Sequence, residues 1–501
     1  MPLKGTILVT GATGYVGARL VSRLLWRGYS VRAAGRSLDR LRRRHWSGHP
    51  LVDLVVADAL DPGALARACE GCGAAYYLVH SMVPGGGDFE ETDRKAAENM
   101  ARAAGEAGLS RLIYLGGLGE DDATLSPHLR SRAEVGEILA GGTTPVTVLR
   151  AAMILGAGSA SFEILSYLVD RLPVMITPRW VRTECQPIGI RNVLDYLVGC
   201  LETPATAGGT FDIGGPGVVT YRELMHAYAQ EAGLRRRFIL PIPVFTPSLS
   251  SRWIHLITPV HAEVAQPLAE GLVNRVVCGD VRIRELVPVD LDGYREAIRA
   301  ALGPRNFRFL EADLPPGWVG WETYRYPGDP PWAGGTFYRE RWRVRVRATP
   351  EEFWKQVAGL GGENGWYYRS WLWQLRAAFD RMIGGIGMRR RPPGVPLAPG
   401  GELDFWRVVA MIPNRELRLV AESKLPGEGI LSFHLRDAGD GSTELTQMAQ
   451  FLPRGVGGMA YWALVAPFHR FIFPGFVREI ARRTGKPVVA GPEQVPEVES
   501  E

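Results

Sequence analysis

Lysine is rare in this 501-residue sequence: five of its 58 basic residues are lysines, which leaves 53 arginines (58 − 5). The 53 acidic residues nearly balance them, and the formal net charge is only +5. A charge this small over such a length does not indicate a nucleic acid or an anionic membrane as the partner. Aromatic residues stand near Arg389, Arg390 and Arg391, but no recognisable nucleic-acid-binding module accompanies them, so we expect no nucleic acid.

Long hydrophobic runs are also missing. No stretch reaches the roughly 18 apolar residues of a transmembrane helix. The nearest candidate, residues 455–468, is closed by His469 and Arg470 and predicts a buried helix. Met1 leads directly into a strand pattern without a secretory signal, so we expect a cytoplasmic protein with no transmembrane segment.

Cysteine is scarce as well, with five residues in all. This odd number, without a secretory signal, is typical of a reducing compartment. Cys69 and Cys72 have the C-x-x-C spacing, but neither a second pair nor a nearby histidine completes a metal site. We therefore interpret this pair as structural and expect no metal.

Glycine, by contrast, is placed with regularity at the start of the chain. Residues 6–10 are a short apolar run typical of a strand buried on both faces, and "GATGYVG" (11–17) follows. A helical leucine pattern and a second strand at 31–34 complete a strand, turn, helix and strand in about thirty residues. This arrangement predicts a dinucleotide-binding unit, in which glycines permit the tight turn, the approach of a pyrophosphate and close helix packing.

The second strand ends in Gly35-Arg36, where an NAD enzyme usually carries an acid for the ribose hydroxyl. Arg36 can meet a 2′-phosphate instead, which favours NADP, with NAD still possible. The alternative is that Arg36 only begins the basic run of Arg40, Arg42, Arg43 and Arg44 on a solvated helix face.

The spacing G-x-x-G-x-x-G, with the strands at 75–82 and 111–119, resembles the extended and atypical branches of the short-chain dehydrogenase/reductase superfamily. The likeness covers about residues 5–303 and is nearest to the NmrA-like branch and the related complex I accessory subunit. It implies a doubly wound parallel α/β Rossmann fold, in which Asp58 touches the adenine. The cofactor-binding set that we expect is Thr10, Gly11, Thr13, Gly14, Tyr15, Val16, Gly17, Arg36, Asp58, Ala59, His80, Ser81, Gly116 and Arg132.

The catalytic Ser, Tyr and Lys of that family are all replaced. Gly116 stands at the end of the fifth strand, and His128-x-x-x-Arg132 stands where Tyr-x-x-x-Lys would be. Ser126 can cap the helix with Pro127 after it, which puts His128 and Arg132 on one face. The helix dipole and Arg132 should keep the imidazole of His128 neutral.

Two interpretations of these residues remain open. In one, His128 is the proton donor and Arg132 holds the ribose, with His80 as a second candidate acid. In the other, His128 and Arg132 only bind cofactor or cap the helix, and His80 is a buried structural histidine. On the substrate side, three interpretations of Glu163 and Arg179 remain open: they contact the substrate, they pair with each other, or they pair with surface partners.

The composition changes beyond residue 303, where ten of the fourteen tryptophans lie. Residues 304–334 are rich in Pro, Gly and Trp and predict a linker packed on the surface. The order strand, helices, antiparallel meander and long helix (about 456–484) over 335–490 resembles the α+β START-like helix-grip fold and a bacterial domain of unknown function. Residues 491–501 predict a disordered acidic tail. Trp366, Tyr367, Trp371 and Trp373 line an apolar cavity or form an ordinary aromatic core.

Together these features predict an NADP(H)-binding oxidoreductase that reduces an apolar carbonyl, enone or quinone-like compound. The alternative is a non-catalytic NAD(P)H sensor or assembly protein with a hydrophobic-ligand-binding second domain. The sequence carries no signal for the oligomeric state.

Overall fold

The computed structural model describes residues 5–80, 89–119, 125–241, 257–303, 328–330, 332–389, 391 and 396–496. The chain divides into two compact units, Met1–Gly335 and Thr336–Glu499. The described end of the segment expected to be a linker, from Gly328 onward, therefore belongs to the first unit.

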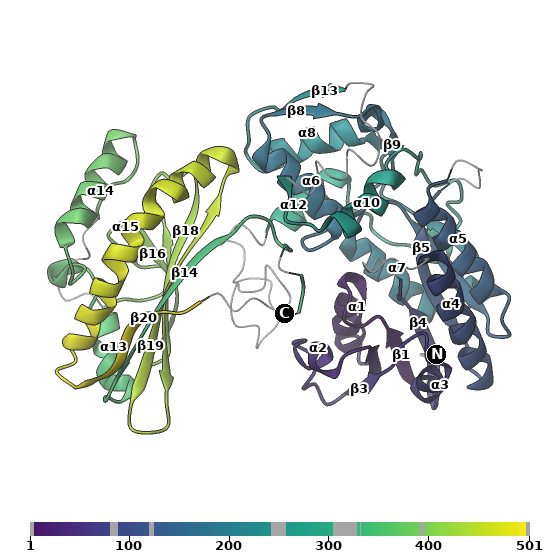
Figure 1. Ribbon diagram of the computed structural model, residues 1–501, viewed down its shortest axis with the longest axis horizontal. Coiled ribbons are helices and arrows are strands. Elements are labelled where there is room, and N and C mark those ends of the chain that lie inside the picture. The colour runs from purple at the N-terminus through teal and green to yellow at the C-terminus, as the bar shows by residue number, and fades with distance from the viewer. Residues whose placement is uncertain are drawn as a thin grey trace. The chain divides into compact units, whose positions relative to one another are not determined.

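The first unit is built on a seven-stranded sheet in which every neighbouring pair is parallel (Figure 1). Its order is β3-β2-β1-β4-β5-β6-β11. The chain reverses direction across the sheet between β1 and β4, which is the switch point of a doubly wound fold. The strands are β1 (Thr6–Thr10), β2 (Val31–Gly35), β3 (Val52–Val56), β4 (Cys72–Tyr77), β5 (Leu112–Gly117), β6 (Val146–Ala151) and β11 (Thr210–Ile213). The expected Rossmann fold is confirmed.

Helices cover both faces of this sheet because alternate strand residues point to opposite sides. Ile7 and Val9 belong to one core cluster, which includes residues of α1 (Tyr15–Trp26) and α7 (Ile190–Glu202). Leu8 belongs to the other. That second cluster includes residues of α3 (Pro62–Cys69), α4 (Phe89–Glu106) and α5 (Pro127–Ala140). Helix α2 (Leu38–Arg42) follows β2.

The rest of the first unit contains a further apolar cluster beyond the carboxyl ends of the strands. Phe162, Met225 and Ile298 are buried there. The helices are α6 (Ala160–Arg171), α8 (Tyr221–Glu231), α10 (Ala262–Gly271) and α12 (Tyr294–Leu302), with the short helix η1 (Arg179–Arg182). Helix α11 (Ile283–Leu286) contacts β11 and the short helix η2 (Pro204–Thr206) instead, and its Ile283 belongs to the cluster of α1 and α7. Three two-stranded ladders complete the first unit: β7 (Ile154–Leu155) with β10 (Ile188–Gly189), β8 (Val174–Thr177) with β13 (Phe238–Pro241), and β9 (Glu184–Cys185) with β12 (Val219–Thr220).

The second unit contains an antiparallel seven-stranded sheet, ordered β15-β16-β17-β18-β19-β14-β20. The strands are β14 (Tyr338–Val346), β15 (Glu402–Leu403), β16 (Trp406–Ile412), β17 (Glu416–Ala421), β18 (Gly427–Asp437), β19 (Thr443–Pro453) and β20 (Val488–Gln494). The helices are α13 (Pro350–Ala358), α14 (Ser370–Met382) and α15 (Gly455–Arg482), with the short η5 (Gly362–Asn364). Helix α13 starts in a capping box, in which Thr349 and Glu352 satisfy each other's backbone N–H groups.

Aromatic residues fill the core of the second unit. The rings of Trp366 and Trp373 stack with centroids 4.6 Å apart, and Phe476 of α15 packs against both. The indole N–H of Trp366 donates to the carboxylate of Asp404 at 2.6 Å. Trp371 is exposed instead. These tryptophans therefore follow the aromatic-core interpretation, with Trp371 outside it.

The end of the chain departs from the expected disordered tail. Residues 491–494 are part of β20, which pairs with β14 on the side away from β19. Glu493, read as part of an acidic tail, accepts hydrogen bonds from Arg343. Residues 497–501 lie outside the described residues.

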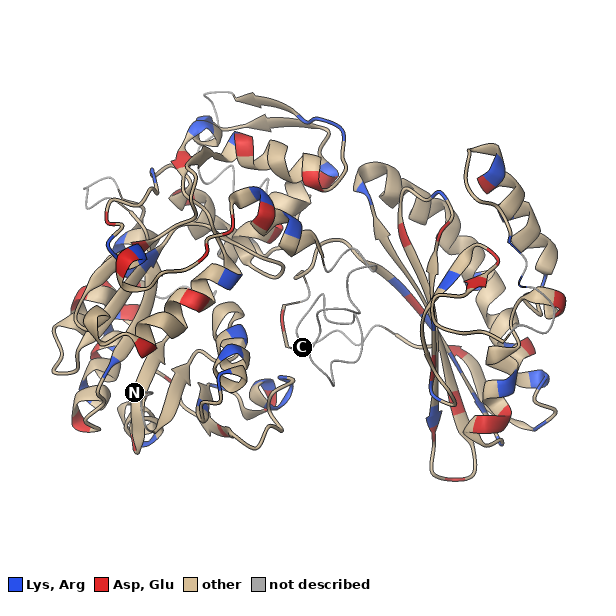
Figure 2. Ribbon diagram, turned by 180° about the vertical axis from the view of Figure 1, so that it is seen from behind, with Lys and Arg blue, Asp and Glu red and all other residues tan. Residues whose placement is uncertain are grey.

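Basic and acidic residues are interspersed along the elements of each unit (Figure 2). Many arginines form ion pairs with neighbouring acids, as Arg407 does with Glu422 and Arg295 with Glu231. The abundance of arginine therefore produces local pairs, each worth little where it is exposed.

Candidate functional site

The glycine-rich turn between β1 and α1 has the geometry that its spacing predicts. Gly11 has φ +69°, and a Cβ there would lie 2.5 Å from the carbonyl oxygen of Leu78. A Cβ on Gly17 would overlap the carbonyl oxygen of Gly11. Gly14 is the N-cap of α1, and no side chain caps that helix end. The positive end of the helix dipole is thus presented to an anion, as pyrophosphate binding requires.

A cavity of about 450 Å³ lies at this end of the sheet. It is lined by the turn residues Thr13 to Gly17, by His80 after β4 and by Gly116 and Gly117 of β5. Ligands of open α/β sheets bind at this switch point, beyond the carboxyl ends of the strands. The cavity is therefore the candidate cofactor site.

Helix α5 brings two of the predicted catalytic residues to the same cavity. The hydroxyl of Ser126 accepts the backbone N–H of Leu129 at 3.4 Å, so the predicted cap is present. His128 then lies in the first turn and Arg132 one turn later, and both line the cavity with His80. A Cβ on Gly117 would lie 2.9 Å from the Leu129 side chain and 3.8 Å from that of Arg132. The end of β5 is thus closely covered by α5.

Both histidines are held neutral at physiological pH. Burial, and then the charge of Arg132, lowers the pKa of His128 to about 3. Loss of hydration, followed by the charges of Arg132 and His128, lowers the pKa of His80 well below 6.5. His80 keeps exposed surface, but it is a wall of the cavity. The sequence predicted a neutral His128 because of the helix dipole and the charge of Arg132. Burial lowers the pKa of His128 more than the charge of Arg132 does.

The far part of the cavity is apolar. Its walls come from α6, η1, α8 and α10 and their neighbours, and they include Leu165, Leu168, Trp180, Tyr221, Met225, Leu268 and Leu272. An apolar chamber that opens onto a few polar groups is the usual form of a small-molecule site.

Some predicted cofactor residues have other partners. The Thr10 hydroxyl donates to the carbonyl of Tyr76 at 3.0 Å and joins β1 to β4. The Asp58 carboxylate accepts the N–H of Leu60 at 3.0 Å, and the carbonyl of Ala59 accepts the side-chain amide of Asn99. Arg36 follows β2 with an exposed side chain. Ser81 lies outside the described residues.

Several residues at the cavity were not predicted from the sequence. Arg40 and Arg44 line it, as do Asp329 and Trp332 from the end of the first unit. Arg44 is buried, so the basic run that ends at this residue is not wholly exposed to solvent. The spacing of four residues between Arg40 and Arg44 was the available signal for Arg44, whereas nothing in the Pro- and Gly-rich segment pointed to Asp329.

Glu163 and Arg179 do not form the pair that was considered for the substrate side. Glu163 is fully buried and accepts the N–H groups of Gly158, Gly334 and Gly335. Arg179 is exposed. The buried carboxylate is satisfied by backbone amides, which is what its burial requires.

In the part of the chain that the structure describes, the arrangement of side chains does not indicate metal or thiol chemistry. There, no group of three or more His, Cys, Asp or Glu side chains is placed to hold a metal ion. Cys69 and Cys72 are free and buried, and burial raises the pKa of Cys69 to about 12. Among the described helices, none has the length and hydropathy of a membrane span.

Residues 11–153 match a family described as NAD(P)H-binding, and residues 332–476 match a family described as a protein of unknown function (DUF2867). The first match covers the glycine-rich turn, β5 and α5. The first unit therefore contains an NAD(P)H-binding domain, and its glycine-rich turn has the geometry that a pyrophosphate requires.

The chain is also similar to named proteins over part of its length. It is 26% identical over 262 residues to the chloroplastic divinyl chlorophyllide a 8-vinyl-reductase of Oryza sativa subsp. indica, which covers 50% of this chain and 64% of that protein. The same enzyme of Zea mays is 27% identical over 224 residues, 42% of this chain and 55% of that protein. The chain thus spans less than two thirds of the length of these relatives.

Solved structures resemble the first unit more distantly. The triphenylmethane reductase of Citrobacter sp. superposes with a TM-score of 0.49 at 16% identity, covering 60% of this chain and 99% of that one. An NADPH-dependent quinone oxidoreductase of Escherichia coli gives 0.48 at 16% identity, covering 58% and 98%.

Proposed function

We propose that the chain is an NADP(H)-dependent oxidoreductase, related to the short-chain dehydrogenases, that reduces an apolar carbonyl, enone or quinone-like compound. The observation that carries this proposal is the continuous cavity, which joins the glycine-rich turn to an apolar chamber with His80, His128 and Arg132 between them. The 26% identical relative is named a reductase, which supports the same class of reaction.

The choice of NADP over NAD rests on the arginines after β2. Arg36 stands where an acid would otherwise accept the ribose hydroxyls, and Arg40 lines the cavity two positions into α2. Guanidinium groups match a 2′-phosphate in charge and in hydrogen-bond geometry.

When bound, the cofactor supplies the hydride, which leaves an electron pair and a negative charge on the substrate oxygen. Arg132 would hold the hydroxyls of the nicotinamide ribose, and its fixed positive charge also favours the negative charge on that oxygen. The neutral imidazole of His128 can then donate its N–H proton to the oxygen, and His80 offers a second donor. The apolar walls exclude water, which would otherwise weaken the electrostatic stabilisation.

A second candidate function follows from the replacement of Ser, Tyr and Lys by Gly116, His128 and Arg132. A neutral imidazole is a weaker acid than imidazolium. A weak proton donor is sufficient in a protein that binds the cofactor without turnover. In this case the chain is an NAD(P)H sensor or assembly protein of the NmrA-like or complex I accessory type. The second unit, which we propose is a START-like domain, would then hold a hydrophobic ligand between α15 and the sheet.

Steady-state oxidation of NADPH distinguishes the two functions. The full chain is incubated with NADPH and a panel of apolar quinones, enones and ketones, and cofactor consumption is compared with the amount of protein. The oxidoreductase consumes many equivalents with at least one compound. The sensor binds NADPH, as titration shows, and consumes none above the background rate.

A further inference from the structure

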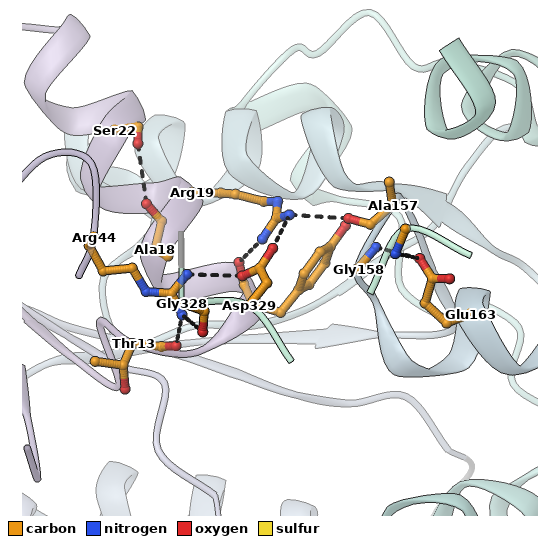
Figure 3. Close-up of polar contacts among 12 residues, drawn as sticks. Thr13, Ala18, Arg19, Ser22, Arg44, Ala157, Gly158, Glu163, Gly328 and Asp329 are labelled. Carbon is orange, nitrogen blue, oxygen red and sulfur yellow. Dashed lines mark hydrogen bonds and ion pairs between the residues drawn. The ribbon is translucent and has the colours of Figure 1, made fainter. Parts of the chain in front are cut away.

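A buried ion-pair cluster joins the end of the first unit to its glycine-rich turn (Figure 3). Arg44 donates through Nη1 to Oδ1 of Asp329 at 2.9 Å, and Arg19 of α1 donates through Nη2 to Oδ2 at 3.0 Å. The side chain of Asp329 is 1% exposed, that of Arg44 1% and that of Arg19 8%. Desolvating three charges is costly, so this cluster has to be held by its full set of bonds.

The two arginines are fixed to the cofactor end of the cavity. Arg44 also donates to the carbonyls of Thr13 and Gly328. Arg19 donates to the carbonyls of Tyr15 and Ala157, and its guanidinium lies 4.0 Å from the centre of the Tyr15 ring. Asp329 is thereby held against the turn that receives a pyrophosphate.

The same segment is fixed again at the substrate end. Glu163 of α6 accepts the N–H of Gly334 on Oε1 and that of Gly335 on Oε2, both at 2.9 Å. These glycines have φ +87° and +78°, a conformation that favours glycine. The hydroxyl of Tyr167, also on α6, donates to the carbonyl of Trp332 at 2.9 Å.

Between these two attachments, Asp329, Pro330 and Trp332 line the cavity. The segment therefore runs from the glycine-rich turn to the wall of the apolar chamber and joins both halves of the first unit. We propose that residues 328–330 and 332–335 form a strap that closes NAD(P)H into the cavity. This proposal rests on the binding of NAD(P)H there and adds a wall of the site that lies far beyond residues 11–153.

The strap also has a consequence for the second unit. The chain passes from Gly335 directly to β14, which begins at Tyr338. Opening of the strap therefore releases the segment by which the second unit is tethered. Segments that close over a bound cofactor commonly set the rate of its release.

Hydrogen exchange and cofactor release test the strap in the full chain, with NADPH as the probe. We expect NADPH to slow amide exchange in peptides that cover residues 328–335. Asp329→Asn should speed NADPH dissociation tenfold or more, because it removes the charge that holds both arginines. Asp195→Asn breaks the ion pair with Arg23, also on α1 but away from the cavity, and should leave dissociation unchanged.

Other results would overturn the proposal. Exchange over 328–335 that is unchanged or faster with NADPH would show that the strap does not close on the cofactor. If Asp329→Asn does not fold, Glu163→Gln releases the other attachment and should speed dissociation in the same way; a wild-type rate in that variant contradicts the strap. Failure of the wild-type chain to bind NADPH would reject the cofactor site itself, whereas normal binding with an indifferent strap rejects the strap alone.

Discussion

At the scale of single residues, the proposed chemistry depends on three side chains that line one cavity. Arg132 carries a permanent charge, while His80 and His128 are kept neutral by loss of hydration and by that charge. A cation next to two neutral imidazoles can bind an anionic or polarised oxygen and still provide N–H donors to it. The roles of His128 and Arg132 should therefore separate on mutation.

Arg132→Ala should weaken NADPH binding by about 1.5–3 kcal/mol, the scale of a lost charged hydrogen bond. His128→Ala should leave NADPH affinity nearly unchanged and lower turnover by about 100-fold or more, the usual contribution of a general acid. Titration of both variants, with turnover on the best compound of the panel, measures the difference. Full turnover in His128→Ala would remove His128 as the donor and move that role to His80.

The low pKa of His128 also has a consequence for stability. Its pKa is about 3 in the folded chain and about 6.5 when unfolded, so between these values the unfolded chain binds more protons. Stability that is present above pH 6.5 is therefore lost as the pH falls toward 3. The melting midpoint of the first unit should fall less between pH 7 and pH 4.5 in His128→Gln than in the wild type.

The same substitution at His49, an exposed residue of the first unit, controls for the loss of a histidine as such. An unaltered pH dependence in His128→Gln would mean that His128 does not titrate as its surroundings indicate.

At the scale of elements, we propose that cofactor choice is made between β2 and α2. Arg36 follows the strand, and Ser37 caps the helix by accepting the N–H of Arg40. Arg36→Asp should weaken NADPH binding by ten- to a hundredfold and NADH binding much less, because an acid repels the 2′-phosphate and suits the ribose hydroxyls. Arg42→Asp makes the same charge change at an exposed position outside the cavity lining. Equal affinity of the wild type for both cofactors would show that Arg36 does not select.

The elements also show which parts of the molecule a sequence can predict. The glycine-rich turn, β1, α1, β2 and the Ser126 cap follow from local rules of spacing and capping, and each was predicted. The meander and the long final helix, observed at Gly455–Arg482, follow from alternation and apolar content. The expectation of a buried helix over 455–468 was wrong, because most of these residues are partly or fully exposed, with Leu464 and Phe468 among the exposed apolar side chains.

The contacts of Asp329 and Glu163 could not be predicted, because each joins segments far apart in the chain. Asp329 meets Arg19 across 310 positions, and Glu163 meets Gly334 across 171. Strand β20 was missed for a related reason. Its residues Val488 to Gln494 are mostly exposed, and only their pairing with β14 makes them a strand.

At the scale of the whole molecule, the chain consists of two units with separate cores. Strand β20 is the edge strand of the sheet of the second unit, next to β14. The second unit therefore includes residues beyond 490. A fragment of residues 336–496 should melt cooperatively on its own. A fragment ending at 487 exposes an edge of β14 and should melt at a lower temperature. Absence of a cooperative melt in the longer fragment would indicate that the second unit needs the first one to fold.

We propose that one cavity holds the nicotinamide between the glycine-rich turn and the apolar chamber. A crystal structure of the chain with NADP⁺ bound would show whether it does. We expect the pyrophosphate at the N-terminus of α1, Arg132 within hydrogen-bond distance of the nicotinamide ribose, and C4 of the ring facing the chamber that Trp180 and Met225 line. A nicotinamide ring that points away from His80 and His128, or a cofactor bound outside this cavity, would contradict it.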